Sequence, residues 1–145
     1  MPITVRKIIL WRIEVDNKPG ALASTIEAPA KAGADLKVVM GYRHPSAGGK
    51  AAIEVFPIAG KKQATAAGTA GLSAATIPTL LVEGDNKPGL GHRIAQAIAA
   101  AGINIAFFVG QVIGRKFAAV IGFETEDDAK KATLLIKQAG KGAKA

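Results

Sequence analysis

The sequence contains no cysteine, which excludes a disulfide scaffold, a thiol nucleophile and a thiolate metal site. Its two histidines, His44 and His92, are not spaced from each other or from a carboxylate cluster as metal ligands are. No Ser-His-Asp arrangement and no pair of carboxylates suited to acid–base catalysis is evident. We therefore predict that the protein is not an enzyme and that it holds no metal and no cofactor.

Aromatic residues make up only 5% of the chain, and long apolar runs are missing as well. No apolar stretch approaches the roughly 18 residues of a membrane-spanning helix, and no charged-then-apolar leader opens the chain. These absences predict a cytoplasmic protein with no membrane partner. The net charge of +8 favours a polyanionic partner, but the lysines are scattered and form no long basic run.

What the sequence does contain is an internal repeat. The 145 residues, 49% of them hydrophobic, suffice for one ordinary domain or two very small ones. Asp16–Gly20 reads Asp-Asn-Lys-Pro-Gly, and the same segment recurs as Asp85–Gly89. At this offset Gly33 also meets Gly102. Such an identity inside a longer matching pattern indicates a duplication, with repeats at 1–77 and 78–139 and a flexible tail at 140–145.

Both repeats show the same order of hydrophobic patterns. Apolar residues alternate along 9–15 and again along 79–84, which predicts a strand in each case. Ile94 and Ile98 begin a helical stripe that stops at Gly102. The order β-α-β-β-α, with a fourth strand expected only in the first repeat, predicts an α+β fold. We expect the ferredoxin-like βαββαβ type in two tandem copies, with antiparallel sheets and helices on one face. Further elements of this prediction are strands at 72–77, 103–112 and 117–123 and a helix from a capping-box-like start at 125 to 139.

The first extended segment is too long for one sheet position. Residues 3–15 are continuously extended in pattern, whereas strands usually have about five or six residues. The second repeat lacks its last strand, which leaves an unpaired edge beside its first strand. We therefore predict that Ile3–Ile8 crosses over to pair beside Leu80–Val82 and joins both copies into one sheet. The same segment from a second chain would instead make a swapped dimer.

The repeated Asp-Asn-Lys-Pro-Gly segment lies between a strand and a helix. Asp and Asn are good helix caps, and proline fits the first helical position. The glycine leaves the helix N-terminus open, where free N–H groups and the helix dipole favour an anion such as a carboxylate. In the alternative interpretation the segment is only a well-capped turn. If a ligand binds, Gly89→Val should abolish binding with little effect on folding.

A strand, the turn Asp-Asn-x-Pro-Gly and a helix ending in Ala-Gly-Ile-Asn-Ile resemble the ACT domain. The second repeat carries the fuller match, in Asp85–Leu90 and Ala101–Ile105, and the resemblance covers nearly the whole chain twice. Such domains regulate enzymes of amino-acid metabolism, for example phosphoglycerate dehydrogenase and aspartate kinase. The resemblance implies a small effector, often an amino acid, bound where two ACT domains meet. It also implies a homodimer and a regulated enzyme or regulator in trans.

In the serine-binding members of this family, one Asn in the turn and another at the start of the second strand hold the effector. These positions resemble Asn86 and Asn104, whose amides can accept from an ammonium and donate to a carboxylate. The first repeat keeps Asn17 but has Asp35 at the other position, so two sites would not be equivalent. Many ACT domains bind nothing and only dimerise, which remains an alternative. The turn and the resemblance together predict a ligand site among Asp16, Asn17, Gly20, Ala21, Asp35, Asp85, Asn86, Gly89, Leu90, Asn104 and Ile105.

An RNA-binding module is a further alternative, because RNA recognition motifs share the βαββαβ order. Their third strand needs a basic residue and two outward-facing aromatic residues at alternate positions. Lys116 and Phe117 supply the basic residue and one aromatic, but Ala119 stands where the second aromatic should be. The sequence therefore argues against nucleic acid as a partner.

Overall fold

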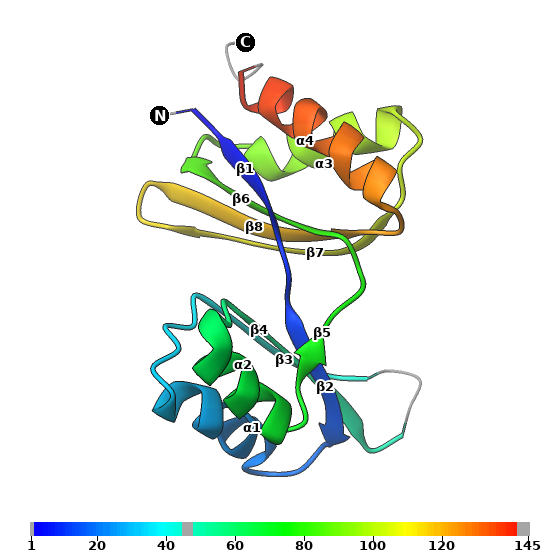
Figure 1. Cartoon of the computed structure of the whole chain (residues 1–145). Coiled ribbons are helices and arrows are strands. Elements are labelled where there is room, and N and C mark those ends of the chain that lie inside the picture. Colours follow the sequence, from blue (N-terminus) through cyan, green and yellow to red (C-terminus); the bar gives the residue numbers. More distant parts are fainter. Residues whose placement is uncertain (1, 45–47, 142–145) are drawn as a thin grey trace. The chain divides into compact units, whose positions relative to one another are not determined.

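The computed structural model describes residues 2–44 and 48–141 (Figure 1). The chain divides into two compact units, which we name the continuous unit, residues 9–76, and the composite unit, residues 1–8 with 77–145. The sequence division at residue 77 assigned the first eight residues to the first repeat, whereas they pack with the second. No helix within the described ranges is long and apolar enough to cross a membrane.

The continuous unit is built on an antiparallel sheet with the strand order β3-β4-β2-β5. Figure 1 shows α1 and α2 side by side against one face of this sheet. The core lies between the helices and the sheet, where Ile53 and Val55 of β4 form one cluster with Ala67 and Leu72. The fourth strand expected at 72–77 is present but short. The elements are β2 (Trp11–Asp16), α1 (Ala21–Lys31), β3 (Val38–Arg43), β4 (Lys50–Phe56), α2 (Gly60–Thr69) and β5 (Ser73–Ala74).

The composite unit repeats this architecture, with the strand order β1-β6-β8-β7. Leu80 and Val82 alternate toward the core, where they meet the helical stripe of Ile94 and Ile98. The last helix is capped as predicted, because the Thr125 hydroxyl accepts a hydrogen bond from a first-turn N–H group at 3.0 Å. The elements are β1 (Thr4–Ile8), β6 (Thr79–Asp85), α3 (Leu90–Ala100), β7 (Ile105–Ile113), β8 (Lys116–Phe123) and α4 (Glu126–Lys141).

Helix α4 is longer than the sequence suggested. It continues through Gly140 to Lys141, so the first residues of the expected flexible tail are helical. Residues 142–145 of that tail lie outside the described residues. The two added residues bring Lys141 to the cavity described below, one helical turn beyond Lys137.

Strand β1 supplies the strand that the second repeat lacks. It runs antiparallel to β6, with Val5 opposite Val82, and takes the position that β5 takes beside β2. Two glycines make room for it: a Cβ at Gly84 would lie 3.1 Å from the Ile3 Cα, and one at Gly140 would lie 2.5 Å from the Ile3 Cγ1. The predicted crossover is therefore confirmed. The prediction of one joined sheet is wrong, because β1 and β2 belong to different sheets.

Candidate functional site

Both Asp-Asn-Lys-Pro-Gly turns open their helices in the same way. Gly20 and Gly89 are the N-cap residues of α1 and α3, with φ of 86° and 83°, and neither helix has a side-chain cap. This left-handed conformation suits glycine and strains other residues. The predicted Asp or Asn cap is therefore wrong, and the proline precedes the helix instead of opening it. The first N–H group of each helix donates to a carbonyl oxygen of the turn, Leu90 to Lys87 at 3.0 Å and Ala21 to Lys18 at 3.2 Å. The N–H groups that follow have no side-chain cap, which is the arrangement that favours an anion.

The aspartates of the turns are held by lysines across the sheet. Lys116 Nζ donates to Asp85 Oδ1 at 2.6 Å, and Lys50 Nζ donates to Asp16 Oδ1 at 2.8 Å. The hydrogen bond from Lys116 lowers the pKa of Asp85 to about 2, and that from Lys50 also lowers the pKa of Asp16. Each pair ties the end of one strand to the start of its neighbour and so fixes the place where the turn begins.

This pairing predicts how the composite unit responds to acid. Because the folded pKa of Asp85, about 2, lies below its ordinary value of 3.8, its stabilising contribution is complete above that value and is lost as the pH falls through 2. Asp85→Asn should therefore be less stable than the wild type near neutral pH and equally stable near pH 2. Urea unfolding of both proteins at several pH values measures this. A stability difference that stays constant down to pH 2 would contradict the assignment.

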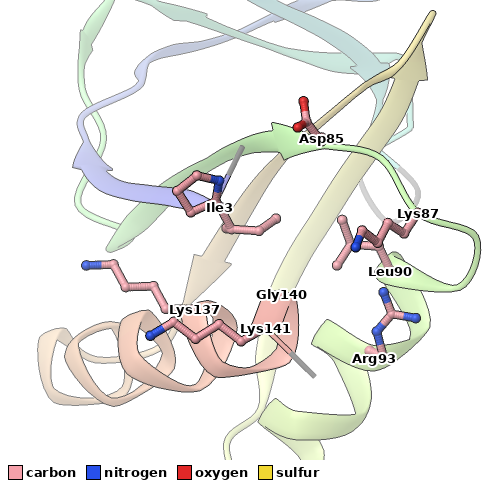
Figure 2. A pocket seen from close by; sticks show the side chains of 9 residues that line it. Ile3, Asp85, Lys87, Leu90, Arg93, Lys137, Gly140 and Lys141 are labelled. Atoms are coloured by element: carbon pink, nitrogen blue, oxygen red, sulfur yellow. The ribbon is translucent and has the colours of Figure 1, made fainter. Parts of the chain in front are cut away.

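A cavity of about 610 Å³ lies beside the Gly89 turn of the composite unit (Figure 2). Three segments that are distant in sequence surround it: the start of the chain, the turn with the first residues of α3, and the last turn of α4. Its lining mixes a few apolar side chains with several charged ones. The lining residues are Pro2, Ile3, Asp85, Lys87, Leu90, Arg93, Lys137, Gly140 and Lys141.

The charge of this cavity is predominantly positive. Four of its side chains are cationic, and Asp85, its one carboxylate, is already bound to Lys116. Arg93 is half-buried, and its Nη1 donates to the Pro88 carbonyl oxygen at 3.2 Å. Its Nε and Nη2 are buried without a hydrogen-bond partner among the described residues. Leaving a buried donor unpaired costs about 1–3 kcal/mol, and more for a charged group, so the guanidinium is suited to a bidentate anion.

The turn of the continuous unit has different surroundings. Its cavity, about 470 Å³, is lined by Asn17, Gly20 and Ala21 together with Gly41–Arg43 of β3. A smaller hollow of about 350 Å³ beside it contains Asp16. The position of Arg93 is occupied by Ser24, and α2 is only 10 residues long where α4 has 16. The cationic cluster is therefore a property of the composite unit.

The remaining predicted residues lie at the other end of each sheet. Asn104 and Ile105 stand at the start of β7, whereas Asp85 lies opposite Lys116, beside the end of that strand. The nine residues of β7 span about 30 Å. Asp35, before β3, is separated from Asp16 in the same way. A single unit thus does not bring Asn86 and Asn104 together, and a site that uses both requires a second module.

The strand that an RNA-binding module would use for base stacking, β8, buries its aromatic residue Phe117. Phe117 of β8 is only 5% exposed and belongs to the core of the composite unit. Its neighbour Lys116 is bound to Asp85. These two positions therefore offer no outward surface on which a base could stack.

The two units define an α+β fold with antiparallel four-stranded sheets, which is the ferredoxin-like class that the sequence predicts. No family model matches the chain, and no curated protein matches it at a significant level. Solved structures do match. Protein BT0572 from Bacteroides thetaiotaomicron has 16% identity over 88% of this chain and 87% of its own, with a TM-score of 0.73.

Two further matches are to aspartate kinases. The ligand-free regulatory subunit of aspartate kinase from Thermus thermophilus has 17% identity over 96% of this chain and 97% of its own, with a TM-score of 0.64. Aspartate kinase from Clostridium acetobutylicum has 16% identity over 95% of this chain and 34% of its own, with a TM-score of 0.60. At these identities the likeness shows the fold, and it confirms the predicted fold class.

Proposed function

We propose that the chain is a regulatory module of the ACT type that binds a small carboxylate, with amino acids among the candidates, and performs no catalysis. The observation that carries the proposal is the Arg93 guanidinium, whose two unpartnered nitrogen atoms are buried beside the uncapped N-terminus of α3. The adjoining cavity, about 610 Å³, has the size of small-molecule sites in general. The shared fold with regulatory subunits of aspartate kinase supports a regulatory role.

In this proposal the turn and Arg93 hold one carboxylate together. The N–H groups of Gly91 and His92 and the guanidinium donate to its two oxygens, since the N–H groups of Leu90 and Arg93 donate to carbonyl oxygens of the turn. The backbone of Asn86 is fixed, because its N–H donates to the Arg115 carbonyl oxygen at 2.8 Å, and this bond holds the turn between Asp85 and Lys87, which both line the cavity. The carboxylate of Asp85 lines the same cavity and can accept from the ammonium group of an amino acid.

We propose that the continuous unit and the composite unit are tandem ACT modules, and that a second copy of the chain completes a homodimer. Pairing two modules would place the Asn104 end of one sheet near the Asn86 turn of another, which one module alone does not do. Effector binding would then alter how the assembly contacts a regulated enzyme in trans.

Replacing Arg93 with Gln should lower the affinity for the carboxylate at least about tenfold, since a hydrogen bond to a charged group contributes about 1.5–3 kcal/mol. The stability of the unliganded protein should change little, because the substitution also removes a buried unpaired charge. A thermal-shift screen of the twenty amino acids and related carboxylates identifies the ligand, and calorimetric titration then compares the two proteins.

Arg115→Gln is the matched control, because it removes the same charge from an exposed residue outside the cavity lining. It should bind like the wild type. Arg93→Lys should recover only part of the affinity, since an ammonium lacks the planar fork of a guanidinium. The proposal is wrong if no compound stabilises the wild type at millimolar concentration, or if Arg93→Gln binds equally well.

A further inference from the structure

The side of the cavity opposite Arg93 is formed by the end of α4. Lys137 and Lys141 are one helical turn apart and both line the cavity, with Gly140 beside them. Neither lysine forms an ion pair within residues 2–44 and 48–141, whereas Lys131 on the same helix pairs with Asp127. The helix dipole favours a cation near a helix C-terminus but does not explain why two line the cavity that holds Arg93.

The start of the chain lies between this pair and the cations of the turn. Figure 2 shows Lys137 and Lys141 on one side of the cavity, Lys87 and Arg93 on the other, and Ile3 between them. The Ile3 side chain can lie this deep because Gly140 leaves the helix surface bare beneath it. The cavity therefore has a cationic pair at each end and an apolar middle.

We propose that this cavity takes a compact ligand with two anionic groups, one held by Lys87 and Arg93 and the other by Lys137 and Lys141. The inference rests on the proposed function, because the first anionic group is the carboxylate assigned there. Asp85 does not neutralise either pair, since Lys116 already holds it. A ligand with a single carboxylate would leave the α4 pair uncompensated, whereas a dicarboxylate or a phosphorylated small acid would neutralise both ends.

Calorimetric titration of the full chain tests this with four probes. Acetate and alanine carry one carboxylate, and succinate and inorganic pyrophosphate carry two anionic groups. Succinate or pyrophosphate should bind about tenfold more tightly than acetate at low salt, because each added partly exposed charge pair contributes a factor of about 1.4 to 5. This preference should shrink as ionic strength rises. The relative affinities of succinate and pyrophosphate distinguish a carboxylate from a phosphate as the second group.

A double variant isolates the α4 end. Lys137→Gln with Lys141→Gln should reduce the affinity for succinate and pyrophosphate about tenfold, toward that of acetate, and leave acetate binding nearly unchanged. Lys130→Gln with Lys131→Gln is the matched control, because it removes two charges from the same helix outside the cavity lining. The control should retain the preference at a fixed ionic strength.

The outcomes separate this inference from the proposed function. If acetate and alanine bind as tightly as succinate and pyrophosphate, or if the Lys137 and Lys141 double variant keeps the wild-type preference, the second anionic group is refuted and the carboxylate site stands. If none of the four probes binds and no amino acid does either, both proposals are refuted. Tight binding that both double variants weaken equally would show general charge attraction and would also refute the assignment.

Discussion

Removal of residues 2–7 is expected to destabilise the composite unit by about 4 kcal/mol while leaving the continuous unit folded. The deletion takes away most of β1, together with the packing of Ile3 and Val5 against the core. Half-buried apolar side chains contribute about 1 kcal/mol each, and each lost strand hydrogen bond about 0.5–1.5 kcal/mol. The edge of β6 would then be unpaired.

Hydrogen exchange locates this effect in the chain. The backbone amides of Thr79–Glu83 in β6 should lose protection, whereas those of Ala51–Val55 in β4 should remain protected. Lys7→Gln is the control, because it removes only the exposed ion pair with Glu126 and should cost less than about 1 kcal/mol. The crossover assignment fails if β6 stays protected in the deletion variant and exchange rises only along β2.

Replacing Gly89 with Val is expected to abolish ligand binding and also to destabilise the composite unit. The residue has φ of 83°, where a side chain costs about 1–2 kcal/mol, and a β-branched one at least as much. A Cβ there would lie 3.4 Å from the Arg93 Nη1, which is already close contact, so the two methyl groups that valine adds beyond the Cβ would crowd the guanidinium. The sequence suggested that Gly89→Val would have little effect on folding. The positive φ shows instead that the variant should lose a measurable amount of stability.

Gly20→Val separates strain from binding. Gly20 has nearly the same conformation, with φ of 86°, but a Cβ there meets nothing within 4 Å. Its variant should lose a similar amount of stability in the continuous unit and still bind the ligand. Calorimetric titration at a temperature below the unfolding transition of both variants compares their affinities for the ligand. Equal loss of binding in both would place the ligand elsewhere, and full binding by the Gly89 variant would remove the turn from the site.

Much of the fold can be predicted from sequence patterns that both repeats share. The repeated turn and the glycines that end α1 and α3 set the order of strands and helices. The crossover of β1 also follows from the sequence, because an extended segment too long for one strand stands beside a repeat that lacks one. The separation into two sheets does not follow, since hydrophobic alternation continues through Ile9 and Leu10 and does not show where the chain leaves one sheet for another.

The candidate site was less accessible from the sequence. Asp16 and Asp85 are of a residue type that often caps helices. Each is instead bound to a lysine that the strand register places opposite it. Arg93 could have been noticed, because it replaces Ser24 at the matching position of the other repeat. Lys137 and Lys141 could not, because their role depends on contact between the two ends of the chain.

The most direct test of the central claim, an anion site in the composite unit, is a titration with succinate followed by backbone amide chemical shifts. The largest shifts are expected in two segments, Asn86–Arg93 and Lys137–Lys141, and both should saturate with the same affinity. The matching turn at Asn17–Ser24 should shift little. Shifts that are absent, spread evenly over surface lysines, or concentrated at Asn17–Ser24 would show that the composite unit does not hold this anion site.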